Sequence, residues 1–147
     1  MASIFTDTND VSYTIDISGE LIESSYSSID GLTKSNVKTA VLGTNVTTIG
    51  NDAFKGASNL TSVTFGENSQ LTNIDWSAFQ EAGLTSITIP DTVTTIGNDV
   101  FLRAKSLTSV TFGENSQLTT IGDGAFREAG LTSITIPDTV TTIESYA

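Results

Sequence analysis

Two reactive residue types are missing from this sequence, and basic residues are scarce. The chain of 147 residues contains no cysteine, which excludes disulfide bonds and thiolate chemistry. It contains no histidine, so the commonest general base and metal ligand is absent. Only 6 lysines and arginines accompany 17 acidic residues, which gives a net charge of −11. Because binding to phosphates needs a basic surface, this balance argues against nucleic acid as a partner.

Long apolar runs and catalytic motifs are missing as well. No stretch approaches the roughly 18 apolar residues that a membrane-spanning helix needs, so we expect no membrane insertion. The opening MASIFTDTND lacks the basic and apolar regions of a secretory signal peptide. The chain has neither a Gly-x-Ser-x-Gly motif nor a phosphate-binding loop. We therefore expect a non-enzymatic protein with no cofactor and no bound metal.

An internal repeat dominates what is present. The stretch 60–100 returns as 107–147, and the two differ at nine of their 41 aligned positions. Each 47-residue unit divides into parts of 24 and 23 residues, which open with LTSVTF and LTSITI. Self-similarity at this period is typical of a solenoid, in which each coil packs only against its neighbours. The hydrophobic content of 37% suits this architecture, because each coil buries only a narrow strip.

The repeat predicts five regular coils, at 37–59, 60–83, 84–106, 107–130 and 131–147. Each coil opens with alternating apolar residues that predict a short strand, and the fixed repeat length makes successive strands parallel. A turn follows, with the sequence Gly-Glu-Asn-Ser in the longer coils and Pro-Asp-Thr in the shorter ones. A second apolar pair comes next. After it lies a segment with one phenylalanine, where we expect one or two turns of helix with the N-caps Asn51, Asn98 and Asp123.

The first 36 residues match the repeat poorly. Alternation of apolar and polar residues from Val11 to Ile17 predicts a strand, which Ser18 and Gly19 end. We expect 11–36 to form a degenerate first coil and 1–10 an extended lead. Together, 1–36 would cap the open face of the first regular coil.

The phrase LTSITIPDTVTTIGNDVF, at 84–101, carries a family resemblance. It resembles the BspA-like leucine-rich repeats, whose units are about 23 residues long. The resemblance lies in three elements: Leu-x-x-Ile-x-Ile-Pro, Val-x-x-Ile-Gly and the phenylalanine. The resemblance covers roughly 37–147 and implies an α/β, predominantly β fold. This fold is a curved right-handed solenoid with a parallel β-sheet on one face and short helical turns on the other. The family commonly has a cysteine three residues after the phenylalanine, where this chain has alanine: Ala57, Ala82, Ala104 and Ala129.

The resemblance also implies a surface-exposed, ligand-binding or adhesive role, of a kind common in bacteria, protists and large viruses. The candidate binding face comprises the outward positions of the predicted strands: Ser62, Thr64, Ser86, Thr88, Ser109, Thr111, Ser133 and Thr135. Stacked about 4.8 Å apart, these hydroxyls form a ladder that suits a protein or glycan partner. Ordinary β-propensity on a solvated sheet gives the same pattern. The uniformity of the ladder favours a repetitive ligand or a plain structural surface over a specific protein epitope.

Two other sets of polar residues repeat along the chain. The Thr-x-Thr pairs at 92–94 and 139–141, together with recurring Thr-Thr dipeptides, raise ice binding as a remote alternative. An acid also follows each predicted strand: Glu67, Asp91, Glu114 and Asp138. A solvated acidic edge explains these four residues better than a calcium site does.

The last coil presents apolar residues with no following coil to cover them: Leu131, Ile134, Ile136, Val140 and Ile143. An open strand edge of this kind pairs readily with another chain. We therefore expect this edge to contact a second copy or another protein. The sequence favours a protein-interaction or adhesion module at a cell or virion surface. The alternative is a structural or decoration component of a larger assembly such as a virion, held through this edge.

Overall fold

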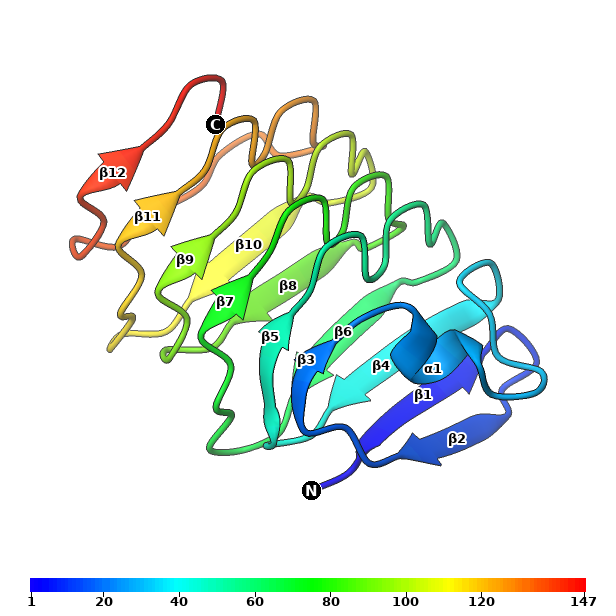
Figure 1. The fold of residues 1–147 in the computed structure, drawn as a ribbon. Helices are drawn as coiled ribbons and strands as arrows, with labels where there is room; N and C mark the ends of the chain where they lie inside the picture. Colours follow the sequence, from blue (N-terminus) through cyan, green and yellow to red (C-terminus); the bar gives the residue numbers. More distant parts are fainter.

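The chain winds into a three-sided solenoid of stacked coils (Figure 1). The computed structural model describes residues 1–147. The first side carries the strands β4 (Val37–Leu42), β6 (Ser62–Phe65), β8 (Ser86–Ile89) and β10 (Ser109–Phe112). The second side carries β3 (Gly19–Leu21), β5 (Val46–Ile49), β7 (Asn73–Ile74), β9 (Thr95–Ile96), β11 (Thr120–Ile121) and β12 (Thr142–Ile143). The third side contains turns without strands.

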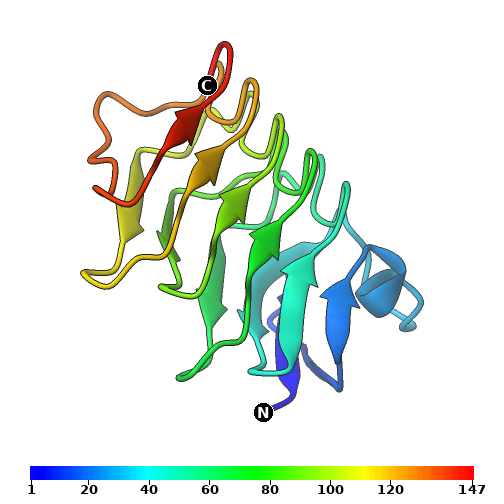
Figure 2. The ribbon, with the colours of Figure 1, turned by 60° about the vertical axis from the view of Figure 1, so that its left-hand side comes forward.

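The second side is one continuous parallel sheet of six strands, which stands in front in Figure 2. Its order, β12-β11-β9-β7-β5-β3, follows the order of the coils, and the chain passes through the other sides of the solenoid between most neighbouring strands. The isoleucine that ends each strand from β5 onward lies in register with that of the next coil. The parallel stacking predicted from the fixed repeat length is therefore confirmed, as is the predicted solenoid class.

The first side is interrupted between β6 and β8. Strand β6 pairs in parallel with β4, and β10 pairs in parallel with β8, but β6 and β8 share no sheet. The Gly66 amide, at the end of β6, donates to the Leu42 carbonyl at 2.9 Å. Pro90 occupies the same place after β8 and has no N–H to donate. Near the start of β8, the Thr85 amide bonds back to the earlier coil, reaching the Thr61 carbonyl at 3.5 Å.

The strand predicted at the start of the last coil does not form. Residues 131–136 have the same sequence, LTSITI, as 84–89, yet only the earlier copy contains a strand. Both copies precede a proline, Pro90 or Pro137, which weakens pairing to the previous coil. Strand β8 is nevertheless a strand because β10 pairs with its other edge. Residues 131–136 have no strand on that edge, so the prediction was wrong there.

The third side consists of consecutive hydrogen-bonded turns instead of the expected helical turns. In the coil at 37–59, alternate amides donate to carbonyls of the next coil: Asp52 to Trp76, Phe54 to Ala78 and Gly56 to Gln80. Asp52 and Gly56 have left-handed φ values of 55° and 71°, which a right-handed helix does not accommodate. Asn51, Asn98 and Asp123 therefore cap no helix. The only α-helix is α1 (Ser24–Ser27), so the fold is almost entirely β.

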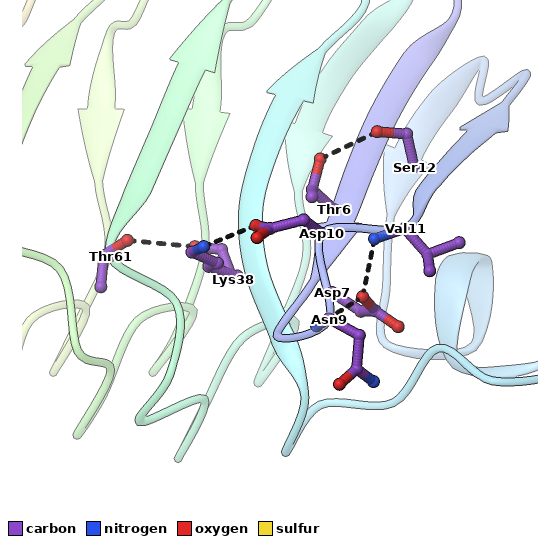
Figure 3. Close-up of polar contacts among 8 residues, drawn as sticks. All are labelled: Thr6, Asp7, Asn9, Asp10, Val11, Ser12, Lys38 and Thr61. Carbon is purple, nitrogen blue, oxygen red and sulfur yellow. Dashed lines mark hydrogen bonds and ion pairs between the residues drawn. The ribbon is translucent and has the colours of Figure 1, made fainter.

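An antiparallel hairpin covers the N-terminal end of the first side. Strand β1 (Ser3–Asp7) pairs with both β2 (Ser12–Ile15) and β4. In the hairpin turn the Asp7 carboxylate accepts the amides of Val11 at 2.9 Å and Asn9 at 2.8 Å (Figure 3). These hydrogen bonds, that of Val11 first, hold the pKa of the Asp7 carboxyl below its ordinary value. Lys38 of β4 pairs with Asp10 at 2.6 Å and so ties the turn to the first regular coil.

A column of aromatic rings runs through the core beneath the third side. Phe54, Phe79, Phe101 and Phe126 stack with ring centroids 5.3–5.5 Å apart and nearly parallel planes. Tyr26 of α1 continues this column on Phe54 at 5.2 Å, and its hydroxyl donates to the Ala53 carbonyl at 2.7 Å. Burial raises the pKa of Tyr26. One ring from each coil thus fills the space that the coil spacing sets.

Candidate recognition face

The eight predicted binding residues lie on the outer surface of the first side, but they do not form one uninterrupted ladder. Strands β6, β8 and β10 each carry a Ser/Thr pair, whereas Ser133 and Thr135 lie on 131–136, outside any strand. Ser62 is half-buried, and the other seven residues are exposed. The ladder predicted from the repeat is therefore divided where the sheet is divided.

The paired strands β8 and β10 form a ridge in the middle of this face, defined by Ser86, Thr88, Ser109 and Thr111. Ser86 lies opposite Ser109, and Thr88 lies opposite Thr111. The hydroxyl oxygens of Thr88 and Thr111 are 2.8 Å apart, within hydrogen-bonding distance. The ridge is therefore a fixed, hydroxyl-bearing surface two strands wide.

Groove 1 lies on one flank of the ridge, between β6 and β8. It has a volume of about 620 Å³, and its walls carry Ser62 and Thr64 on one side and Ser86 and Thr88 on the other. The turn that follows β6, with Asn68, and the turn that begins at Pro90 close one end. The groove occupies the place where hydrogen bonds between β6 and β8 are missing.

Groove 2 lies on the other flank, between β10 and 131–136, with a volume of about 500 Å³. Most of its residues are those of groove 1 displaced by one 47-residue repeat unit, since Thr64 corresponds to Thr111, Thr88 to Thr135 and Pro90 to Pro137. The chain contains two prolines, and one lies in each groove. The repeat therefore produces the same site twice.

The groove linings are polar and carry no basic residue. In groove 1 the apolar lining residues are Val63, Phe65 and Ile87. The Asp91 carboxylate packs against the next coil, where a side chain at position 113 would collide with it and glycine leaves room. Its buried Oδ1 has no hydrogen-bond partner in the protein. The linings thus offer hydroxyls and, in groove 1, the Asn68 amide.

The threonines of the second side are engaged differently. One threonine hydroxyl per coil donates to a backbone carbonyl of the preceding coil: Thr72 to Thr47, Thr94 to Thr72, Thr119 to Thr94 and Thr141 to Thr119. These bonds are 3.1–3.4 Å long. The second side therefore uses these hydroxyls to join coils. Ice binding through threonine ladders stays a prediction.

The C-terminal face is the exposed surface of the last coil. An apolar hollow of about 270 Å³ opens there, lined by Ile121, Phe126, Leu131, Ile134, Ile136, Ile143 and Ala147 among others. Ile143 is 58% exposed, and the other four residues of the predicted assembly edge are half-buried. The edge residues do lie together, as the repeat predicts, while their role in assembly stays a prediction.

The acidic residues that follow the strands do not gather into a site. Glu67, Glu114 and Asp138 are exposed, and Asp91 is half-buried. No group of three or more acidic side chains is arranged to hold a metal ion. No helix in the structure has the length and apolar character needed to cross a membrane.

Sequence reasoning missed the two grooves. The available signal was the placement of the two prolines, since each stands where the longer coils have glycine, and the Gly66 amide bonds back to the preceding coil. The first copy of the repeat also carries Trp76, where the second copy has Asp123. Trp76 is 49% exposed, and the Lys55 ammonium lies 5.5 Å from its ring centroid.

The comparisons with known proteins agree with this architecture. The model of the BspA type leucine-rich repeat region matches residues 30–147 in six copies. The crystal structure of the pneumococcal vaccine antigen PcpA is similar, with a TM-score of 0.70 and 27% identity over 72% of this chain and 26% of that one. A leucine-rich cell surface protein from Faecalibacterium prausnitzii has a TM-score of 0.53 and 24% identity over 94% of this chain and 41% of that one.

Both structures are therefore much longer than this chain, which spans less than half of either. A search of curated proteins gives no significant match. The repeat model covers well over half of the chain, and its repeats coincide with the stacked coils. The resemblance predicted from the sequence is confirmed: this chain belongs to the BspA-type leucine-rich repeat proteins.

Proposed function

We propose that this chain is a non-enzymatic recognition or adhesion module, displayed at a cell surface, whose partner binds across the ridge and its two flanking grooves. One observation carries this proposal. Ladder hydroxyls of the first side stay exposed, whereas threonine hydroxyls of the second side bond to the preceding coil. The first side therefore retains the hydrogen-bonding capacity that a partner needs.

The location of similar proteins supports display at a surface. The F. prausnitzii structure is described as a cell surface protein, and PcpA as a vaccine antigen. Leucine-rich repeats are generally used for protein interaction, and solenoids bind along extended surfaces. The chain also lacks the histidine and cysteine that most catalytic sites use.

Replacing Thr88 and Thr111 together by lysine is expected to weaken partner binding at least tenfold, which corresponds to about 1.4 kcal/mol. The two lysines would break the contact between the hydroxyls and place charge on the ridge. Binding is measured by biolayer interferometry against a panel of immobilised extracellular-matrix proteins and polysaccharides. Circular dichroism checks that the variant keeps its fold.

The matched control is Thr72→Lys with Thr119→Lys. These two threonines are also exposed and also make hydroxyl hydrogen bonds to a neighbouring coil, but they lie on the second side. The control adds the same charge and is expected to bind like the wild type. Ladder variants that bind the panel as well as the control does would refute recognition through the ridge.

A second candidate function is assembly through the C-terminal face. The apolar hollow and the exposed Ile143 favour it, because a second copy that covers them would remove apolar surface from water. We propose a second copy of this chain as the occupant. A role in a larger assembly such as a virion would use the same face.

A further inference from the structure

Grooves 1 and 2 present one chemical environment twice. Their linings share the Ser-Val-Thr-Phe-Gly strand end, a serine from the following turn, the Ser-Ile-Thr segment and a Pro-Asp-Thr turn. The ridge separates them, and the Thr88–Thr111 contact links their walls. A ligand that fits one groove therefore fits the other, so a ligand with a repeating structure gains from both.

Charge limits the ligand to neutral or positively charged molecules. Neither lining contains lysine or arginine, while Asp91 lies in groove 1 and both Glu114 and Asp138 lie in groove 2. The chain as a whole carries a net charge of −11. Phosphate, sulfate and carboxylate groups would meet repulsion without a compensating cation.

The lining differs from the anchor pockets of protein–protein interfaces. Such pockets are dominated by tryptophan, tyrosine and arginine, none of which occurs in either groove. Hydroxyls, the Asn68 amide and the Asp91 carboxylate instead supply many donors and acceptors over a short distance. The half-buried Phe65 adds one apolar face. A polyhydroxylated ligand matches this set, because its hydroxyls both donate and accept hydrogen bonds.

The spacing of the grooves selects among such ligands. The grooves are two coils apart, and parallel strands are about 4.8 Å apart, so equivalent points lie about 10 Å apart along the solenoid axis. In an extended β-linked glycan, successive sugars alternate in orientation, and the same face returns at every second sugar after a comparable distance. A coiled α-linked glycan has no such repeat.

We propose that grooves 1 and 2 together bind a neutral, extended β-linked glycan, with every second sugar entering a groove. This inference rests on the recognition role proposed for the first side and assigns its ligand class. Each groove ends at a proline, which lacks the amide that Gly66 uses to bond to the preceding coil. A glycan of at least three sugars spans both grooves.

Isothermal titration calorimetry with soluble hexasaccharides from chitin and cellulose tests the proposal. At least one of them is expected to bind about 100-fold more tightly than its own disaccharide. Once one groove is occupied, the rest of the same chain is held at a high effective concentration near the second groove. Maltohexaose, the α-linked counterpart of the cellulose fragment, is expected not to bind. The proposal would be overturned if the β-linked hexasaccharides bind no more tightly than maltohexaose, or if neither of them binds.

Pro90→Gly and Pro137→Gly each restore an amide at the position that Gly66 uses to bond to Leu42. Either variant is expected to reduce hexasaccharide affinity to that of the disaccharide, and the double variant to abolish binding. Thr64→Val with Thr111→Val removes one equivalent hydroxyl from each groove and keeps side-chain shape, with Thr72→Val and Thr119→Val as the control on the second side. Wild-type affinity in both the proline and the valine variants would contradict the assignment.

The outcome for the glycan is separable from that for the recognition role. Loss of binding to matrix proteins in the ridge variant, with no glycan bound, would support the first side as a recognition surface and show that its ligand is a protein. If the ridge variant keeps its binding to matrix proteins and no hexasaccharide binds the wild type, both proposals are overturned.

Discussion

Phe79→Ala is expected to lower the free energy of unfolding by about 3–5 kcal/mol, the cost of emptying a fully packed aromatic site. Phe79 is fully buried and stacks on Phe54 at 5.4 Å and on Phe101 at 5.5 Å. Removing its ring creates a cavity in the middle of the column and takes away two stacked contacts. Because each coil is stabilised only by its neighbours, the loss weakens the link between the two halves of the solenoid.

The control for this change is Phe126→Ala, at the far end of the same column. Phe126 is half-buried and stacks on a single ring, that of Phe101, at 5.3 Å. Its loss is expected to cost clearly less than that of Phe79. Urea unfolding followed by circular dichroism measures both values. Equal costs at the two positions would show that the column does not stabilise the stack as described.

The wild-type chain is expected to associate in solution above its monomer mass of 15.4 kDa, and Ile143→Lys is expected to keep it at that mass. Ile143 is 58% exposed beside an apolar hollow of about 270 Å³. A lysine there would place a charge in the contact between two copies, while its exposure leaves the fold of one copy intact. Light scattering behind a sizing column, over a concentration series, measures the mass.

Ile22→Lys is the matched control for the C-terminal face. Ile22 is also an exposed isoleucine, at 41%, but it lies in the N-terminal region beside α1. This variant should associate like the wild type. A wild-type mass that stays at 15.4 kDa at every concentration would exclude assembly through the C-terminal face.

The stacking of the coils could be predicted from the sequence because it depends on residue type alone. Period-two apolar residues formed strands, one phenylalanine per coil formed the column, and the constant repeat length made the strands parallel. These features follow from burial and geometry, which the coils share because each packs against its neighbours.

The strand content of the first side could not be predicted from local sequence. The hexapeptide LTSITI is largely a strand at 84–89 and not at 131–136. The difference lies in the neighbour, since β10 pairs with the first copy and no strand pairs with the second. Hydrogen bonding between coils therefore decides the structure where local propensity is identical.

The third side was mispredicted for a related reason. Segments such as Asn51-Asp52-Ala53-Phe54 begin with a residue that commonly caps helices. In the solenoid their alternate amides find carbonyls in the next coil, and Asp52 adopts a left-handed backbone to present them. Bonds between coils thus replace the bonds within a helix.

Site-resolved amide hydrogen exchange, followed by NMR, tests most directly whether the prolines open the first side into two grooves. Amides between β4 and β6 and between β8 and β10 are expected to exchange slowly, because ladders bury them. We expect fast exchange for the amides of β6 and β8 that face groove 1 and for the amides of 133–136. Pro90→Gly is expected to slow exchange of the amides that face groove 1. Equal protection across all these junctions would contradict the divided sheet and both grooves.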